Sequence, residues 1–464
     1  MRRQMISGMT FLGMLLLGAC ADDTPDYAAP ASAAVSTIEP VDVMWDTRSY
    51  EGEEAQTESV LETYTSADGR CVIEKKPSYY EVYLDYQDGD YAAAGRAYAE
   101  AILKIDLDYA TVMEPYLYEN INMAFPNLNG DYTPVEERIY ALLQNLPEEY
   151  ATELESFAQA ISDGRKGMES DGKLSYEEAL LASLVPDALR EFSCNSLAVW
   201  GEKSESGQMM VSRTMEWPQG SEFQMCMAQA VIHFQMGEGK NSYTGIAVLG
   251  MLDMLTGLND KGVFAGVLDA GSDDVYECEG KKCYTYELRY AMEHLGDARS
   301  VGEYMVSESE SFTFAHNVLI TDAKECVVAE DYVGSPEESN GAVLRDQHST
   351  LADGLVWEHP DSLCAVNAFV TEGNYSRLAR SGGNYVRFCK FHTWLGEKER
   401  LTFADVKGIV TRERTDHKTV FQKLYSENVF HIVTYDYATG HMEICFTGTE
   451  GIVDHPVFTR VETD

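Results

Sequence analysis

The sequence predicts an α+β protein with a helical first part and a second part built of strands. Between residues 88 and 193, apolar residues recur at intervals of three and four, the spacing of helices that bury one face. The segments concerned are residues 91–105, 109–123, 134–146, 148–161 and 176–192. After residue 194 the pattern changes to short apolar runs typical of strands, beginning with 209–211, 228–234, 246–251 and 263–268. With 45% hydrophobic and 11% aromatic residues, the 464-residue chain can bury a large core, so we expect a globular protein.

The N-terminal residues predict export and lipid attachment. Arg2 and Arg3 precede an apolar stretch that is too short to span a bilayer. The stretch ends in Leu-Gly-Ala-Cys at Cys20, which resembles the lipobox of bacterial lipoproteins. We therefore expect a signal peptide over residues 1–19, a lipid anchor at Cys20 in the bacterial cell envelope, and a flexible tether over the polar residues 20–45.

The chain is strongly acidic, with a formal net charge of −42 at pH 7. A surface of this charge repels phosphate backbones, which argues against nucleic-acid binding. We interpret the charge as a solubilising acidic coat.

Residues 194–217 read as an antiparallel hairpin, because two apolar runs flank a polar run bounded by glycines. If the turn centres on Ser204, the partner of Cys194 lies near position 214, and a bulge could shift it by a residue or two. Arg213 is then expected beside Cys194, where a guanidinium stabilises the thiolate. Glu216 would be close enough to pair with Arg213 or to hold a polar group at the start of the first strand. The alternative is a buried Cys on an ordinary hairpin with a solvated Arg–Glu pair.

This hairpin resembles the start of the mature chain in the N-terminal nucleophile hydrolases that use a cysteine. The resemblance is greatest to the penicillin acyltransferase branch, with choloylglycine hydrolases and acid ceramidase-like amidases as more distant relatives. Their second strand ends in Arg-Asn-x-Asp-Trp, and here residues 213–217 read Arg-Thr-Met-Glu-Trp, so Asn is lost and Glu replaces Asp. The resemblance implies a four-layer αββα sandwich over residues 194–464. It implies that residues 46–193 form a helix-rich pro-segment or α chain.

Further site residues follow from this resemblance. Residues 364–369 are similar to the family's Val-Thr-Asn-His-Phe, which implies that Asn367 donates to the oxyanion; an Asn that caps a strand or turn is the alternative. Where choloylglycine hydrolases carry an oxyanion-hole Asn, this chain has Asp269, whose carboxylate would repel an oxyanion. Asp269 is therefore expected to hold the nucleophile's amino group or to lie slightly outside the site, and Asn317 is a reserve candidate. For the supporting arginine, the distance to the following apolar helix favours Arg387, while Arg377 and Arg380 remain open.

No metal and no cofactor are expected. Residues 169–178 resemble part of a calcium-binding loop, but Gly167 stands at the first ligand position, so Ser175 is interpreted as the N-cap of a helix. Cys278 and Cys283 could close a short loop by a disulfide. Two cysteines at this spacing could also form half of a zinc site, but no second pair of ligands follows in the sequence.

The resemblance implies a hydrolase or acyltransferase that acts on a small N-acyl amide or short peptide through a thioester on Cys194. Autoproteolysis before Cys194 would free its α-amino group, with a pKa of about 8 in simple compounds, as the general base. Arg213 would stabilise the charge that develops in the reaction, and Glu216 would orient the neighbouring groups of the site. The rival hypothesis is a non-catalytic surface lipoprotein that keeps the fold for binding. A papain-type peptidase is ranked last because no Gly-Cys-x-x-Cys-Trp segment is present.

Overall fold

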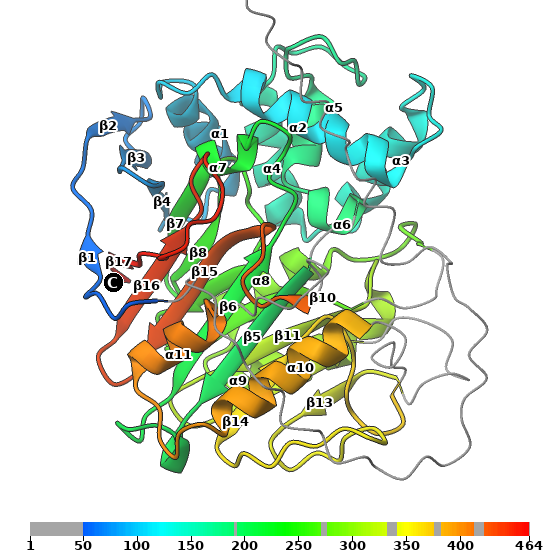
Figure 1. The fold of residues 1–464 in the computed structure, drawn as a ribbon. Helices are drawn as coiled ribbons and strands as arrows, with labels where there is room; N and C mark the ends of the chain where they lie inside the picture. The colour runs from blue at the N-terminus through cyan, green and yellow to red at the C-terminus, as the bar shows by residue number, and fades with distance from the viewer. Residues whose placement is uncertain are drawn as a thin grey trace, which may run out of the picture. The chain divides into compact units, whose positions relative to one another are not determined.

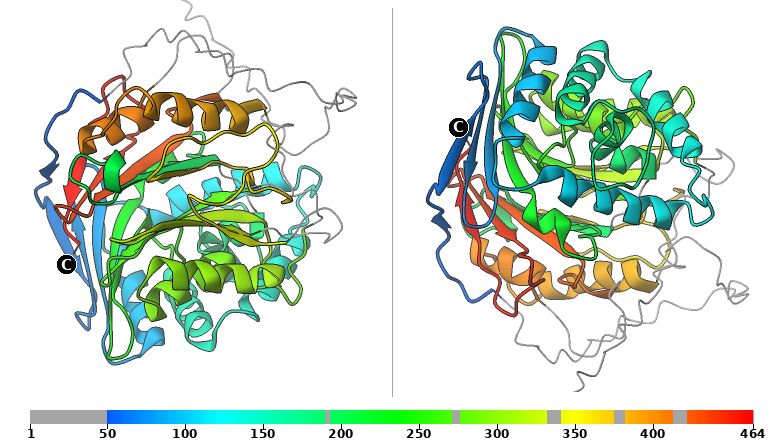
Figure 2. Two further views of the ribbon diagram at one scale, coloured as in Figure 1. Left: turned by 90° about the horizontal axis from the view of Figure 1, so that it is seen from below. Right: turned by 90° about the horizontal axis from the view of Figure 1, so that it is seen from above.

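The computed structural model describes residues 50–189, 193–270, 276–331, 341–374, 382–412 and 422–463, all within one compact unit. Two β-sheets lie face to face, and helices cover the outer face of each (Figures 1 and 2). The α+β class and the four-layer αββα arrangement predicted from the sequence are thereby confirmed. The signal peptide, Cys20 and the tether lie outside the described residues. No helix in the described part of the chain is long and apolar enough to cross a membrane.

The first sheet has seven strands, and the predicted hairpin lies between β15 and the edge strand β14. Its strands, in spatial order, are β1 (Gln56–Thr57), β17 (Thr459–Val461), β16 (His441–Phe446), β15 (Val429–Asp436), β6 (Met210–Glu216), β5 (Ser193–Val199) and β14 (Ser362–Ala365). Helices α10 (Gly382–Leu395) and α11 (Phe403–Val410) cover its outer face, in orange in Figure 2. The hairpin strands β5 and β6 are buried along almost their whole length, which places any side chain on them in a water-poor environment.

The second sheet has ten strands and packs against the first. Its strands, in spatial order, are β13 (Val343–Arg345), β12 (Cys326–Asp331), β11 (His316–Thr321), β10 (Phe264–Asp269), β9 (Thr256–Asn259), β8 (Tyr243–Val248), β7 (Gln229–Met236), β4 (Tyr80–Tyr86), β3 (Cys71–Lys75) and β2 (Glu62–Thr65). Helices α8 (Tyr284–His294) and α9 (Ala298–Glu308) lie on its outer face.

The front region is helical, as predicted, with one correction. Its helices are α1 (Tyr91–Ile102), α2 (Tyr109–Ala124), α3 (Thr133–Leu143), α4 (Glu148–Ile161), α5 (Tyr176–Ala182) and α6 (Val185–Leu189), followed by the short α7 (Gln224–Met227). The single helix predicted over residues 176–192 is two helices, because Pro186 cannot donate the amide hydrogen that a continuous helix needs. Ser175 does cap α5, and it forms a reciprocal capping box with Glu178.

The front region also contributes four strands that the periodicity did not predict. Strands β2 and β3 form a hairpin whose turn contains Asp68-Gly69, with Gly69 at φ 77°, a strong local hairpin signal. Strand β4 then pairs in parallel with β7, from Tyr80 opposite Ala230 to Tyr86 opposite Met236. Strand β1 pairs with β17 near the C-terminus. Both sheets therefore contain strands from each side of residue 194.

A buried ionic network joins the front region to the rest of the protein. The fully buried guanidinium of Arg289, on α8, lies 2.6 Å from Glu153 on α4 and 2.9 Å from Glu293 on its own helix. It also donates to the carbonyl of Leu252 at 2.8 Å and lies 4.4 Å from the ring centroid of Tyr150. Burial raises the pKa of Glu153, while the neighbouring guanidinium opposes that rise. The charges are held in place because each would be very costly without the other.

Replacing Glu153 with Gln should lower the free energy of unfolding by about 3 kcal/mol, because one carboxylate partner of a buried guanidinium is lost. Urea denaturation followed by circular dichroism measures the change. Glu155→Gln is the matched control, since Glu155 is exposed on the same helix, and its effect should stay within about 0.5 kcal/mol. Equal stability of the two variants would contradict this account of the network.

Candidate active site

The β5–β6 hairpin has nearly the register that the sequence predicted. Cys194 lies opposite Met215, one residue from the expected position, and Arg213 lies opposite Ser196. The turn needs Gly201, whose φ is 51° and whose missing Cβ would lie 2.3 Å from the carboxylate of Asp361. The hairpin therefore brings the thiol and the guanidinium to adjacent positions on neighbouring strands.

Cys194 and Arg213 are in direct contact and both are fully buried. Nη2 of Arg213 donates to the sulfur at 3.3 Å and to the carbonyl oxygen of Val267 at 2.7 Å. Val267 is on β10, so this side chain crosses from one sheet to the other. Gly266 makes room for it, because a Cβ there would lie 2.7 Å from Cγ of Arg213. Within the described residues, Nε and Nη1 of Arg213 have no hydrogen-bond partner.

Burial and charge act in opposite directions on this pair. Burial raises the pKa of the Cys194 thiol, whereas the guanidinium of Arg213 and a backbone hydrogen bond from Glu216 lower it. Burial likewise lowers the pKa of Arg213, and the neighbouring sulfur opposes that effect. Each charged form is thus stabilised by the other, so the guanidinium offsets part of the effect of burial on the thiol, whose pKa is raised on balance.

Asn367 lies against the backbone of Cys194. Its Oδ1 accepts a hydrogen bond from the amide nitrogen of Cys194 at 2.7 Å, and its Nδ2 donates to the main-chain carbonyl of Asp269 at 2.6 Å. The two sides of the amide are distinguishable because only the oxygen can accept and only the nitrogen can donate. Asn317 fixes this segment by donating to the carbonyls of Val366 at 2.9 Å and Ala368 at 3.1 Å.

Arg387, on α10, holds the other side of the same backbone. Its Nη2 donates to the carbonyl oxygen of Cys194 at 2.6 Å and to Oε2 of Glu216 at 2.7 Å. Ser426 donates to the second oxygen of Glu216 at 2.5 Å. The sequence allowed Glu216 to pair with Arg213, but in the structure Glu216 pairs with Arg387. The reason is the strand period: residues three apart point to opposite faces of a sheet.

All six predicted site residues meet at one place in the fold. Five do so through side chains, and Asp269 contributes its main-chain carbonyl. Arg377 and Arg380, the competing arginines, lie outside the described residues. Three polar side chains at this place were not predicted: Ser193, which precedes Cys194, Ser426, and Asn384, whose Nδ2 donates to the carbonyl of Asn367 at 2.9 Å. Of these three, only Ser193 could have been recognised from the sequence, because it is adjacent to Cys194.

The described residues were also compared with the expectations for metal ligands and for a disulfide. No cluster of three or more His, Cys, Asp or Glu side chains there could hold a metal ion. Cys278 and Cys283 are both free thiols, so the disulfide suggested for them is not formed.

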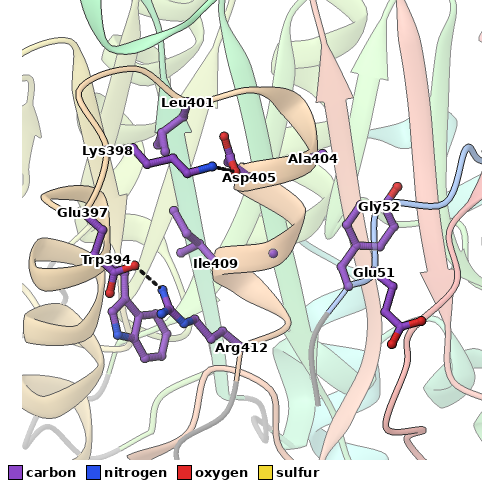
Figure 3. A pocket seen from close by; sticks show the side chains of 12 residues that line it. Glu51, Gly52, Trp394, Glu397, Lys398, Leu401, Ala404, Asp405, Ile409 and Arg412 are labelled. Atoms are coloured by element: carbon purple, nitrogen blue, oxygen red, sulfur yellow. Dashed lines mark hydrogen bonds and ion pairs between the residues drawn. The ribbon is translucent and has the colours of Figure 1, made fainter. Parts of the chain in front are cut away.

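A groove of about 440 Å³ lies elsewhere, between α10, α11 and residues 50–52 (Figure 3). Trp394, Ile409 and Arg412 are among the residues that line it. None of the six predicted site residues does, so this groove is separate from the thiol.

Comparison with known proteins gives partial structural likeness only. No family model matches the sequence, and no curated protein matches it. Similar solved structures include an N-acylethanolamine-hydrolyzing acid amidase ortholog from Caenorhabditis elegans, with 12% identity, a TM-score of 0.35, and coverage of 53% of this chain and 96% of the other. A variant of conjugated bile acid hydrolase from Clostridium perfringens has 13% identity, a TM-score of 0.34, and coverage of 58% and 97%. Penicillin V acylase from Agrobacterium tumefaciens has 12% identity, a TM-score of 0.31, and coverage of 55% and 83%.

Replacing Arg213 with Gln should raise the pKa of the Cys194 thiol, because the cation bonded to the sulfur is removed. Alkylation of Cys194 by iodoacetamide at pH 8 should then slow by about tenfold or more, measured by mass spectrometry of the peptide that contains it. Arg299→Gln is the control, because Arg299 is a half-exposed cation paired with Glu325. An unchanged rate in Arg213→Gln would show that the guanidinium does not set the reactivity of this thiol.

Proposed function

We propose that this protein is an N-terminal nucleophile hydrolase or acyltransferase that cleaves an N-acyl amide through an acyl-thioester on Cys194. The observation that carries the proposal is the double anchoring of Cys194: its sulfur is bonded to Arg213 while its amide nitrogen is bonded to Asn367. A buried structural cysteine requires neither contact. A nucleophile that uses its own amino group requires both, because sulfur and nitrogen must be held together at one carbonyl group.

The residues have distinct parts in the proposed reaction. Once the α-amino group of Cys194 is free, it takes the thiol proton, and Oδ1 of Asn367 orients it by accepting an N–H. The thiolate, favoured by Arg213, attacks the amide carbonyl, so that an S–C bond forms. The C–N bond then breaks and the amine leaves with the proton. Water or a second amine opens the thioester and restores the thiol.

The positioning residues act through the backbone of Cys194. Arg387 fixes its carbonyl group and is itself held by Glu216. In this arrangement Asn367 orients the nitrogen of Cys194 through Oδ1, and one N–H of its Nδ2 is bonded to the carbonyl of Asp269, which leaves the second N–H for the oxyanion donation expected from the sequence.

The proposal includes maturation by autoproteolysis before Cys194, which the same contacts support. The thiol of Cys194 attacks the carbonyl carbon of Ser193, the peptide C–N bond breaks, and the nitrogen of Cys194 takes the thiol proton. Water then hydrolyses the thioester and leaves residue 193 with a carboxylate. Arg387 supports this step because it holds both sides of the bond, at Oγ of Ser193 (2.8 Å) and at the carbonyl oxygen of Cys194 (2.6 Å).

Purified wild-type protein should therefore appear in intact-mass spectrometry as two chains that meet between Ser193 and Cys194. Cys194→Ala should remain a single chain and be inactive, because no nucleophile is left. Cys194→Ser should be cut slowly, since a hydroxyl is a weaker nucleophile than a thiolate at neutral pH. An active wild type with an intact bond at this position would contradict the amino-group mechanism.

We also propose that the mature protein is held at a membrane surface in the cell envelope by lipid on Cys20. The support is the N-terminal pattern of Arg2, Arg3, a short apolar stretch and a lipobox-like Cys. A fatty-acid analogue fed to expressing cells should label the wild type and not Cys20→Ala. Cys226→Ala, which removes a cysteine far from the N-terminus, serves as the control and should keep the label. Equal labelling of wild type and Cys20→Ala would contradict lipidation.

A further inference from the structure

The side chain of Ser193 occupies a small polar site beside the nucleophile. Its hydroxyl accepts a hydrogen bond from Nη1 of Arg387 at 2.8 Å and donates one to Oδ1 of Asn367 at 3.0 Å. Nη1 of Arg387 also lies 3.1 Å from Oδ1 of Asn367 and 3.4 Å from Oδ1 of Asn384. Both partners of the hydroxyl therefore belong to the group of residues that positions Cys194.

The same sulfur attacks two carbonyl groups in the proposed function, first that of Ser193 and later that of the substrate. Arg213 holds the sulfur and Arg387 holds the carbonyl of Cys194, so the line of attack is common to both reactions. We place the acyl carbon of a substrate close to the position of the carbonyl carbon of Ser193, but farther from the nitrogen of Cys194, because the two atoms are no longer bonded after the cut. The second and third carbons of its acyl chain correspond to Cα and Cβ of Ser193, and a hydroxyl on the third carbon corresponds to Oγ.

We propose that the mature enzyme prefers substrates whose acyl group carries a hydroxyl on its third carbon, which Arg387 and Asn367 bind in the place vacated by Ser193. This inference rests on the proposed function and names its substrate class. It concerns the acyl side of the amide, since Ser193 supplies the acyl side of the bond that is cut.

The chemistry of the site selects a hydroxyl over other groups. One partner, the guanidinium, can only donate, and the other, the amide oxygen, can only accept, whereas a hydroxyl does both at once. A carboxylate would face Oδ1 of Asn367 and the nearby carboxylate of Glu216, and an ammonium would face the guanidinium of Arg387. A methyl group would forfeit the hydrogen bonds to Nη1 of Arg387 and Oδ1 of Asn367, which would keep only their contacts with each other, with Asn384 and with the nitrogen of Cys194.

The decisive experiment compares two anilides of equal size, 3-hydroxypropanoyl-4-nitroanilide and butanoyl-4-nitroanilide, with protein whose cleavage before Cys194 has been verified by mass. The 3-hydroxypropanoyl compound should have a kcat/KM at least about tenfold higher, because a lost buried hydrogen bond costs about that factor. In Arg387→Lys the ratio of the two values should fall toward one. Equal or better hydrolysis of the butanoyl compound by the wild type would overturn the preference while leaving the proposed function intact. Hydrolysis of neither compound would count against the proposed function.

A second measurement tests the same site within the chain and needs no external substrate. Ser193→Ala should slow cleavage between residues 193 and 194, whereas Ser193→Thr, which keeps the hydroxyl, should be cut at nearly the wild-type rate. The time course is followed by gel electrophoresis after synthesis is stopped. If the Ala and Thr variants are cut at the same rate, the hydroxyl is not bound productively and the inference fails, whatever the anilides show.

Discussion

The site depends on a guanidinium that crosses between the two sheets. Arg213, on β6, donates hydrogen bonds to the sulfur of Cys194 on the adjacent strand and to a carbonyl oxygen of β10 in the opposite sheet. Because this cation is fully buried, it cannot move away from the sulfur without leaving its own charge unpaired. Two further hydrogen bonds cross between the sheets nearby, from Asn367 to Asp269 and from Asn317 to Val366. The sheet separation and the position of the thiol are thus fixed by the same contacts.

Side chains that lie on the two faces of the hairpin make different contacts with Cys194. On the face toward the second sheet lie the sulfur and Arg213, which concern reactivity. On the face toward α10 lie Glu216 and Arg387, which fix the backbone of Cys194 through its carbonyl group. The buried cations Arg387 and Arg213 can both lie close to Cys194 because they are on opposite faces of the sheet. Each also has its own partner, which is the carboxylate of Glu216 for Arg387 and the sulfur for Arg213. Reactivity and positioning are consequently governed by different side chains.

Sequence reasoning succeeded where the relevant spacing is local. Counting across a hairpin turn placed Arg213 beside Cys194 to within one residue, because an antiparallel register follows from the turn. The same counting left two parts open for Glu216, and the pairing with Arg213 is not the one formed, since proximity along a strand does not say which face a side chain occupies. The pairing of Glu216 with Arg387 spans 171 residues, and no local period encodes it. Arg387 was found only through resemblance, and Ser426 was not found. Strands β2–β4 were not predicted, although the Asp-Gly turn between β2 and β3 is a hairpin signal, because they precede residue 88, where the helical period of the front region begins.

The parallel pairing of β4 with β7 has a consequence for refolding. In the uncut chain, these strands belong to one polymer and meet in a unimolecular search. After a cut before Cys194 they would belong to two polymers, and the β4–β3–β2 end of the second sheet could rejoin β7 only when both fragments meet in solution. Denaturation then becomes a concentration-dependent and practically one-way event, because β7 is left with an open edge that other chains can pair with. The lifetime of a cut protein would then be set by the rate at which it unfolds, and not by an equilibrium between folded and unfolded fragments.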